Sequence, residues 1–363
     1  MNENLRRSEK TVKLLTAHYK AYPKMQIEDI FKYLFQSAFG CEHLVSDGSA
    51  ALDYIKREYE MQSKTESPKT EELDGEYSRA YLSWLNVGLK AETLATLFCL
   101  SAKKESDGRS NLEQKLEIAR NLIKNGDLPF DATAFERGVE EWSLAGYPAI
   151  RHSDVFRSEY HPAYRVIAKG YADFLPLFAK IDGLLDKGNA IIAIEGGSAS
   201  GKTTLSGILK DVYDCNVFHT DDFFLRPAQR TPERLAEIGG NLDRERFYDE
   251  IVVPLRSGEA VCFRPFDCGT QALGEQITAT AKKLTVVEGV YSAHPAFGKY
   301  FDLLVFLDID PEYQKQRIIK RNAPRFAERF FNEWIPLENT YFSGTDIKKH
   351  SDLTFKIISM NVV

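Results

Sequence analysis

A glycine-rich octapeptide is the segment of this sequence whose residue types point most directly to chemistry. Residues 196–203 read Gly-Gly-Ser-Ala-Ser-Gly-Lys-Thr and match the pattern GxxxxGK[ST]. The glycines let successive backbone N–H groups turn inward around a phosphate, the lysine reaches the β- and γ-phosphates, and the threonine hydroxyl binds Mg²⁺. A strand-to-helix turn that binds nothing would need neither the lysine nor this spacing. We therefore expect a nucleotide-binding loop made of Gly196, Gly197, Ser198, Ala199, Ser200, Gly201, Lys202, Thr203 and Thr204.

Three carboxylates follow later apolar runs of the sequence. Asp221 and Asp222 come directly after the run 215–220, and Glu288 ends the run 284–288. Parallel sheets bind their ligands at the carboxyl ends of their strands, where a carboxylate can accept a proton from an attacking hydroxyl and help to hold a metal ion. We expect Asp221 or Asp222 to have this role and Glu288 to bind Mg²⁺. The alternatives are turn-capping aspartates and a solvated acid at a strand end.

Basic side chains recur near the end of the chain. Arg317, Arg321, Arg325 and Arg329 are spaced four residues apart, which stacks cations along one helical side and into the next segment. Phosphoryl transfer needs positive charge that closes over the transferred group and excludes water. A solvated basic helix face is the alternative interpretation of this pattern.

The elements that must position these residues change in kind near residue 188. Short apolar runs separated by helical patterns indicate a parallel sheet covered on both faces; the runs are 190–195, 215–220, 284–288 and 303–308. Residues 188–363 are therefore predicted to form an α/β domain of the P-loop NTPase class.

Residues 1–187 are predicted to form an all-α domain. Apolar side chains recur at spacings of three and four, as one face of a packed helix requires; examples are Ile27, Ile30, Phe31, Leu34, Phe35 and Phe39. The stretch 91–100 is apolar nearly all round and predicts a buried helix. Residues 160–185 predict one long helix, and the charged stretch 62–76 a solvated loop.

Composition limits the class of protein. The chain has 363 residues, of which 43% are hydrophobic and 28% charged, with a formal net charge of -6. This balance is typical of a globular protein and gives no reason to expect a nucleic-acid or membrane partner. The five scattered cysteines form no CxxC pair, and no apolar stretch is long enough for a membrane helix. We expect a cytoplasmic protein. The sequence does not specify its oligomeric state, although the apolar helices of the first half could supply the interface of a homo-oligomer.

Residues 189–356 resemble the uridine kinase and phosphoribulokinase family of P-loop kinases. The resemblance rests on ordered motifs: 196–203, 221–224, 241–243, 265–267, 287–289 and the pair Arg317 and Arg321. The Asp-Asp-Phe-Phe motif is especially similar to that of nicotinamide riboside kinases. The family resemblance implies that the γ-phosphate of ATP is transferred, with Mg²⁺, to a hydroxyl group of a small molecule.

The resemblance also implies roles for individual residues. Asp221 takes the position of the catalytic base, while Thr203 and Glu288 take Mg²⁺ positions. Arg317 and Arg321 take positions in the segment that closes over the nucleotide. On the substrate side it implies that Asp243 binds ribose hydroxyls; the alternative is that Asp243 caps the helix that follows it. It also implies that Phe224 and Phe266 form aromatic walls of the acceptor pocket, with core positions as the alternative, and that Asp222 lies beside them.

Departures from the family pattern leave the substrate open. The nucleoside kinases of the family carry a base-reading histidine shortly after the Pro-aromatic-Asp motif, where this sequence has residues 268–271, Cys-Gly-Thr-Gln. An aromatic residue of the Asn-Phe-Asp motif is replaced by Leu242. A pocket built to hydrogen-bond a base rejects molecules that cannot pair with it. A nucleoside, a phosphorylated sugar and a vitamin-like alcohol are all compatible acceptors.

The first half contains no motif tied to a reaction. Cys41, His43, His152 and His161 are candidate metal ligands without a ligand spacing. A small-molecule or regulatory pocket near Arg151, His152, Tyr164 and Arg165 is a second hypothesis, and capped helix ends with paired polar groups are the alternative. The leading hypothesis for the whole chain is a small-molecule kinase. Its rival is a regulator whose P-loop domain binds ATP to switch the helical domain.

Overall fold

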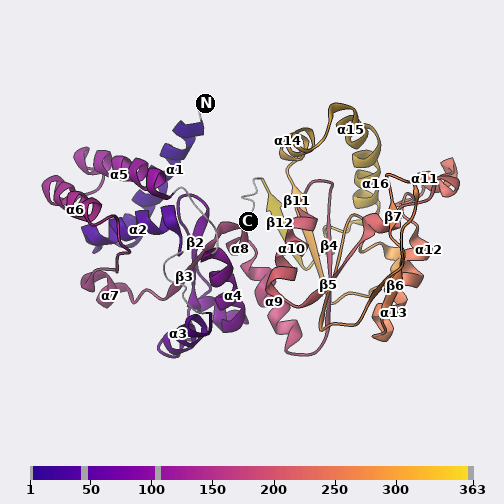
Figure 1. The fold of residues 1–363 in the computed structure, drawn as a ribbon, viewed down its shortest axis with the longest axis horizontal. Coiled ribbons are helices and arrows are strands. Elements are labelled where there is room, and N and C mark those ends of the chain that lie inside the picture. Colours follow the sequence, from indigo (N-terminus) through magenta and orange to yellow (C-terminus); the bar gives the residue numbers. More distant parts are fainter. Residues whose placement is uncertain (1–2, 42–47, 103–107, 359–363) are drawn as a thin grey trace. The chain divides into compact units, whose positions relative to one another are not determined.

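The computed structural model describes residues 3–41, 48–102 and 108–358. The chain folds into two compact units, of which the first ends at Asp182 and the second begins at Gly183 (Figure 1). Helix α9 (Leu175–Leu185) spans this boundary. None of the helices in the described ranges has both the length and the apolar character needed to cross a bilayer.

The first unit is mostly helical. Helix α2 buries Ile30, Phe31 and Leu34 at the predicted spacing, and α4 covers the apolar stretch expected to be buried. Three strands form an antiparallel sheet in the order β1-β2-β3, which the prediction of an all-α domain lacked. The elements are α1 (Glu3–Ala21), α2 (Ile27–Phe39), α3 (Gly48–Glu60), β1 (Thr70–Glu72), β2 (Tyr77–Tyr81), the 3-10 helix η2 (Leu82–Val87), α4 (Ala91–Ala102), α5 (Gly108–Lys124), α6 (Ala132–Leu144), α7 (Asp154–Tyr160), β3 (Tyr164–Ala168), α8 (Lys169–Ala172) and α9.

The prediction of one long helix over residues 160–185 is wrong. Helix α7 ends at Tyr160, because His161 takes a left-handed conformation (φ 41°) and Pro162 has no N–H to continue the helix. Strand β3 follows and pairs with β2, with Tyr164 opposite Tyr81. The β-branched residues Val166 and Ile167 favour a strand. The strand that pairs with this one, β2, lies more than 80 residues earlier, so the local sequence does not reveal the pairing.

The stretch 62–76 is only in part the solvated loop that was predicted. It contains β1, which pairs with β2, and its last residues include the buried side chains of Leu73 and Asp74. The strand was not predicted because its residues are polar and only partly buried, and so resemble a solvated loop.

A five-stranded parallel sheet forms the centre of the second unit, in the order β12-β11-β4-β10-β5. The four predicted strands are confirmed within one residue at each end. The sheet strands are β4 (Ala190–Gly196), β5 (Cys215–His219), β10 (Leu284–Glu288), β11 (Leu303–Ile309) and β12 (Leu353–Ile357), and the small hairpin strands are β6 (Val261–Phe263), β7 (Phe266–Asp267), β8 (Ala272–Leu273) and β9 (Ile277–Ala279).

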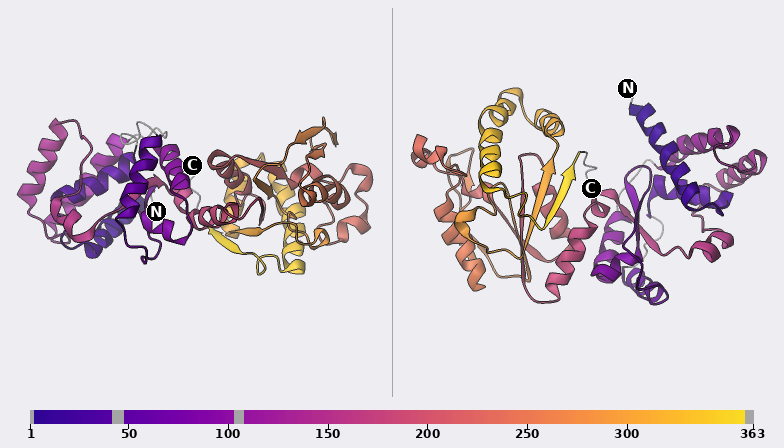
Figure 2. Two further views of the ribbon diagram at one scale, coloured as in Figure 1. Left: turned by 90° about the horizontal axis from the view of Figure 1, so that it is seen from below. Right: turned by 180° about the vertical axis from the view of Figure 1, so that it is seen from behind.

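Helices cover both faces of this sheet. On one face Val287 and Phe306 pack with residues of α12, α13 and α16, and on the other α10 packs against β4, β5 and β10 (Figures 1 and 2). This confirms the predicted α/β fold. The helices are α10 (Lys202–Val212), η3 (Thr220–Phe223), η4 (Pro227–Gln229), α11 (Pro232–Ala236), α12 (Arg244–Phe247), the π-helical turn η5 (Tyr248–Val252), α13 (Val253–Ser257), η6 (Pro295–Phe297), α14 (Pro311–Arg321), α15 (Pro324–Arg329), the π-helical turn η7 (Phe330–Trp334) and α16 (Ile335–Thr345).

Gly289 is a position of the second unit at which a side chain would be both strained and overlapped. Its φ is +139°, and a Cβ there would lie 1.8 Å from Thr220 Oγ1. We expect Gly289→Ala to lower the free energy of unfolding by at least about 2 kcal/mol through strain and overlap. Gly207→Ala is the control, because this exposed helical glycine has nothing within 4 Å of the added Cβ; it should raise stability by about 1 kcal/mol. Urea unfolding measures both, and equal midpoints would contradict the expectation.

Candidate active site

The predicted phosphate loop connects β4 to α10. Gly196 and Gly201 have φ values of +143° and +103°, and Ala199 one of +59°. A Cβ on Gly196 would lie 2.6 Å from the carbonyl oxygen of Leu307, so the close approach of these strands requires glycine. The buried hydroxyl of Ser200 has no hydrogen-bond partner among the described residues. The backbone of the loop is therefore tightly curved, and the Ser200 hydroxyl is an unused hydrogen-bond donor; both features fit a bound phosphate.

Lys202 begins α10 and folds back over the loop. Its Nζ donates to the carbonyl oxygens of Gly196 at 2.8 Å and Gly197 at 3.1 Å. Its charge is therefore held above the loop by two neutral acceptors, which an anionic phosphate oxygen would outcompete.

Glu288 is the point where three segments meet. Its Oε1 accepts from Thr203 Oγ1 at 2.8 Å and lies 2.7 Å from His219 Nδ1, and its side chain is buried. Burial raises the pKa of Glu288, but the hydrogen bond from His219 and the positive charge of Lys202 outweigh it, so that this pKa lies below its ordinary value. The same hydrogen bond raises the pKa of His219. Glu288 is thus a carboxylate beside the hydroxyl of Thr203, and binding of Mg²⁺ by these two residues stays a prediction.

Asp221 and Asp222 lie in η3, at the end of β5. Asp221 is exposed to solvent and Asp222 is partly exposed. The protein atoms around the two carboxyls displace part of their water, which raises the pKa of both, and the negative charge of Glu288 raises both further. Lys202 acts in the opposite direction on Asp221. Asp221 therefore lies within the electrostatic reach of the loop lysine and of Glu288, and a raised pKa brings a carboxylate closer to what general-base catalysis requires.

The predicted metal ligands are oxygen atoms, which Mg²⁺ prefers. In the described part of the chain, no group of three or more His, Cys, Asp or Glu side chains is arranged to hold a metal ion. Mg²⁺ at nucleotide sites takes one or two protein ligands and completes its shell with water and phosphate oxygens. Thr203 and Glu288, with Asp221 near them, fit such a sparse set, and a cation would relieve the repulsion that raises the pKa of Asp221.

The four arginines do not share one helix. Arg317 and Arg321 lie on α14, whereas Arg325 and Arg329 lie on α15 after the break at residues 322–323. Arg321 is the one whose charge acts on Asp221 and lowers its pKa, and it is exposed. Arg329 pairs with Glu333 at 3.0 Å.

The substrate-side motifs lie side by side. The backbone N–H of Asp243 donates to the carbonyl oxygen of Phe223 at 2.7 Å, and Phe224 forms a β-bridge with Leu242. Asp243 is buried and caps α12, and its other oxygen accepts from Gln229 Nε2 at 2.9 Å. Of the two interpretations of Asp243, the structure shows the helix cap. Binding of ribose hydroxyls by Asp243 stays a prediction.

The two aromatic residues differ in burial. Phe266 is 4% exposed, and the guanidinium of Arg230 lies 5.9 Å from its ring centre. Phe224 is partly exposed. Phe266 therefore has the surroundings of a core residue, and its role as a pocket wall stays a prediction.

No pattern in the sequence indicated how the phosphate loop is anchored to the last helices. Ser198 donates its N–H to Glu338 Oε2 at 2.9 Å and its hydroxyl to Glu338 Oε1, while its carbonyl oxygen accepts from Gln314 Nε2 at 2.8 Å. Glu338 is 5% exposed. Helices α14 and α16 therefore hold every polar group of one loop residue.

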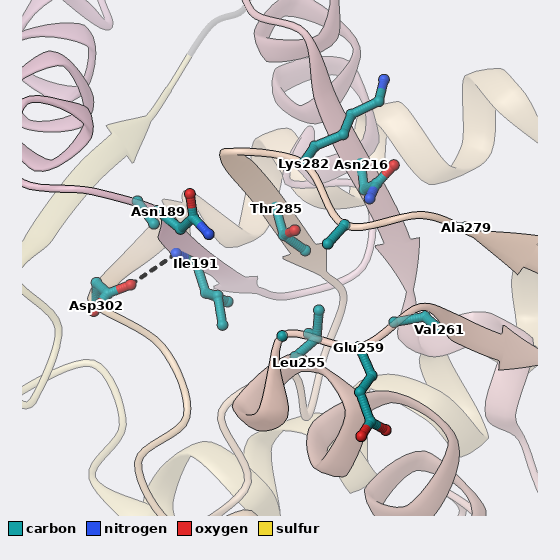
Figure 3. A pocket seen from close by; sticks show the side chains of 13 residues that line it. Asn189, Ile191, Asn216, Leu255, Glu259, Val261, Ala279, Lys282, Thr285 and Asp302 are labelled. Carbon is teal, nitrogen blue, oxygen red and sulfur yellow. Dashed lines mark hydrogen bonds between the residues drawn. The ribbon is translucent and has the colours of Figure 1, made fainter.

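A hollow lies at the opposite edge of the sheet (Figure 3). Asn189, Asn216 and Thr285 line it at the beginnings of β4, β5 and β10, and its volume is about 100 Å³. Because the strands are parallel, this edge is distant from the phosphate loop. We assign the hollow no part in phosphate chemistry.

The candidate metal ligands of the first unit are not brought together as a set. His43 lies outside the described residues. His152 uses both ring nitrogens, on Asp29 at 2.8 Å and Tyr164 at 2.7 Å, and Cys41 donates to the carbonyl oxygen of Phe98. Of the predicted pocket residues, His152 and Tyr164 are in contact, whereas Arg165 pairs with Glu58.

Comparisons with known proteins give two similar sequences. No family model matches the chain. A uridine kinase of Chlamydia pneumoniae is 28% identical over 140 residues, so that the match covers 36% of this chain and 61% of that protein. A uridine kinase of Staphylococcus haemolyticus is 26% identical over 180 residues, 45% of this chain and 85% of that protein. A solved structure described as a possible uridine kinase from Bacillus stearothermophilus aligns with 50% of this chain and 99% of its own, with 22% identity and a TM-score of 0.38.

The anchoring of Ser198 predicts a measurable coupling. Glu338→Ala should lower the free energy of unfolding by about 2 kcal/mol, because two hydrogen bonds to a buried carboxyl group are lost. In a Ser198→Ala background the same change should cost about 1 kcal/mol less, since the hydroxyl bond is already absent. Glu333→Ala is the control, an exposed glutamate paired only with Arg329, and should change stability by less than about 0.5 kcal/mol. Strictly additive losses in urea unfolding would contradict the coupling.

Proposed function

We propose that the second unit, which resembles the uridine kinase-like P-loop kinases, is an ATP-dependent kinase that phosphorylates a hydroxyl group of a small molecule. One observation carries the proposal. Lys202, Thr203, Asp221 and Glu288 meet at the carboxyl ends of three neighbouring parallel strands, β4, β5 and β10. A phosphate cradle, a cation, a metal-binding carboxylate and a base are the parts that phosphoryl transfer needs in one place.

Each residue then has a defined task. The loop N–H groups and Lys202 hold the β- and γ-phosphates of ATP, and Asp221 accepts the proton of the attacking hydroxyl. Arg321, with Arg317, places positive charge against the transferred group. Thr203 and Glu288, with Asp221, would hold Mg²⁺, which neutralises charge on the phosphates when it is bound.

The acceptor lies on the side of Asp222, Phe224, Asp243 and Phe266. The base-reading histidine of the family's nucleoside kinases is replaced here by the stretch that begins at Cys268. Loss of a hydrogen-bonding group from a pocket changes which molecules it rejects. The acceptor is therefore proposed only as a small alcohol, sugar or nucleoside.

The proposal is tested by ADP release from MgATP against a panel of nucleosides, sugars and vitamin alcohols. The Lys202→Ala protein is the blank, because it lacks the cation that holds the phosphates. Release stimulated by one class of acceptor would support the kinase and name its substrate class. If ATP binds but no acceptor raises release above the blank, the proposal fails, and an ATP-gated regulator becomes the better account.

Asp221→Asn separates binding from chemistry. It should leave the affinity for MgATP within a few-fold of wild type, while kcat falls by about two to four powers of ten, the range that loss of a general base usually costs. Asp211→Asn is the matched control, since Asp211 is an exposed aspartate on α10. Nucleotide titration and steady-state kinetics give both quantities. Unchanged kcat in Asp221→Asn would remove this residue from the mechanism.

A further inference from the structure

Helix α2 of the first unit carries a polar stripe on a face that is otherwise packed with apolar side chains. Asp29, Lys32 and Gln36 are three and four residues apart, a spacing that places them on one side of the helix. Asp29 is 0% exposed and Gln36 4% exposed. Burying a polar side chain costs free energy unless the side chain is hydrogen-bonded or ion-paired. The partners of each of these residues therefore need to be identified.

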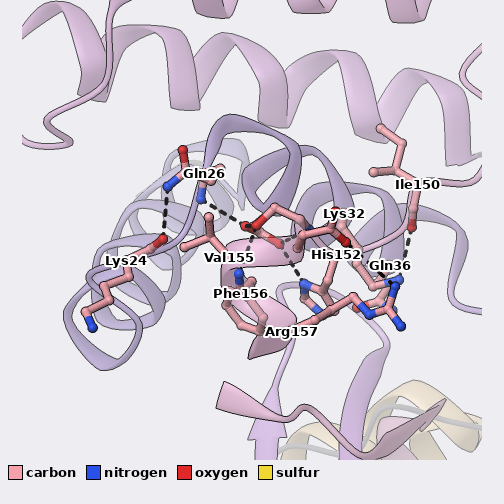
Figure 4. Close-up of polar contacts among 12 residues, drawn as sticks. Lys24, Gln26, Lys32, Gln36, Ile150, His152, Val155, Phe156 and Arg157 are labelled. Atoms are coloured by element: carbon pink, nitrogen blue, oxygen red, sulfur yellow. Dashed lines mark hydrogen bonds and ion pairs between the residues drawn. The ribbon is translucent and has the colours of Figure 1, made fainter. Parts of the chain in front are cut away.

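Asp29 is fully occupied by protein donors. Two of the residues that donate to it, Gln26 and His152, are labelled in Figure 4. Its carboxylate accepts from the N–H of Gln26 at 2.9 Å, the hydroxyl of Ser153 at 2.6 Å, the N–H of Ser153 at 3.1 Å and Nδ1 of His152 at 2.8 Å. Burial raises the pKa of Asp29, but these hydrogen bonds together lower it below its ordinary value. Asp29 is therefore an ionised structural anchor with no remaining capacity to neutralise a neighbouring cation by direct contact.

A chain of hydrogen bonds continues from this anchor to a buried arginine. His152 Nε2 lies 2.7 Å from the hydroxyl of Tyr164, which lies 3.3 Å from Gln36 Oε1, and Gln36 Oε1 accepts from Arg79 Nε at 2.9 Å. Burial lowers the pKa of His152 to about 4, so this ring is neutral. The chain adds no positive charge and fixes the position of the guanidinium.

Arg79 is the unusual member of this group. Its side chain is 0% exposed, and its guanidinium lies 5.4 Å from the ring centre of Tyr33 and 4.7 Å from that of Tyr164. Nη1 pairs with Glu71 at 3.2 Å, but the buried Nη2 has no hydrogen-bond partner among the described residues. In the rigid guanidinium one Nη2–H is parallel to Nε–H, so this unused donor faces the side on which Gln36 lies.

A second cation, Lys32, lies one turn before Gln36 on the same side of α2. Lys32 is partly exposed and uses its Nζ to donate to the carbonyl oxygen of Ile150 at 3.0 Å. Burial lowers the pKa of Lys32 to about 8, and the charges of Arg79 and Arg151 lower it further against the opposing effect of Asp29. The charges of Arg79 and Arg151 thus both act on Lys32, and the carboxylate of Asp29 is already committed to other donors.

We propose that Lys32 and Arg79 form a binding site for a small anionic ligand that carries a carboxylate or a phosphate group, with the exposed Arg151 at its entrance. An anion there would accept from the unused Nη2 of Arg79 and from the ammonium of Lys32. It would also place negative charge beside Lys32 and Arg151, and on the side of Arg79 that its ion pair with Glu71 leaves unused. Gln36, Tyr164 and His152 act as positioning residues for Arg79. The site belongs to the first unit and does not depend on the proposed kinase activity of the second.

The test is calorimetric titration of the full chain with inorganic phosphate and, separately, with malonate. The titrated protein carries Lys202→Ala, which weakens phosphate binding by the loop of the second unit. We expect one site per chain, and a loss of affinity of at least tenfold in Lys32→Met. Lys56→Met is the matched control, because Lys56 is an exposed lysine of the same unit paired with Glu92, and should bind as the parent does.

Proton uptake distinguishes a ligand contact from a structural effect. Near pH 8 about half of the Lys32 side chains are unprotonated, since their pKa is about 8, and a bound anion raises this pKa. Titration in two buffers of different ionisation enthalpy should therefore show uptake of up to about half a proton per site. Lys32→Arg should keep binding but lose this uptake, which covers the case in which Lys32→Met does not fold. No binding of either anion, or binding and uptake that Lys32→Met and Lys32→Arg leave unchanged, would overturn the proposal.

Discussion

The register of β10 between β4 and β5 is the constraint on which the chemistry of the second unit depends. Glu288 is paired with Ile194 on one side and with His219 on the other. The phosphate loop and the segment of Asp221 follow these two partners within two residues. A slip of one residue would turn Glu288 to the other face of the sheet, away from Thr203. Apolar side chains buried on both faces of β10 prevent such a slip.

A second set of contacts ties this edge of the sheet to the last helices. Gln314 and Glu338 hold Ser198 of the phosphate loop. On β4, the strand that leads into the phosphate loop, the buried Glu195 accepts a hydrogen bond from the hydroxyl of Tyr341, which also lies on α16, at 2.8 Å. The arginines of α14 and α15 are thereby connected, through rigid elements, to the loop that they would act on. A movement of these helices when nucleotide binds would be transmitted to the loop by a few hydrogen bonds rather than by the chain connection alone.

Local patterns were predictable from the sequence, and partners distant in the chain were not. The octapeptide at 196–203 and the four apolar strands are defined by neighbouring residues, and they fold as predicted. Strand β3 was misread because the spacing of Tyr164 and Ile167 suits a helix equally well, and only pairing with β2 decides between them. Nothing in the sequence around Glu338 indicates that it contacts the phosphate loop, since its partner Ser198 lies 140 residues earlier. The polar group around Arg79 likewise draws residues from α2, β1, β2, β3 and the segment before α7.

Phosphorus NMR of the reaction tests the central claim most directly, namely that the second unit passes a phosphoryl group to a hydroxyl acceptor. The protein is incubated with MgATP and the acceptor that stimulates ADP release most strongly. The account predicts a phosphomonoester resonance that grows in equal amount with ADP and does not appear with Asp221→Asn. Inorganic phosphate growing in place of the monoester would contradict it, because water would then be the acceptor and the unit would be a nucleotide hydrolase.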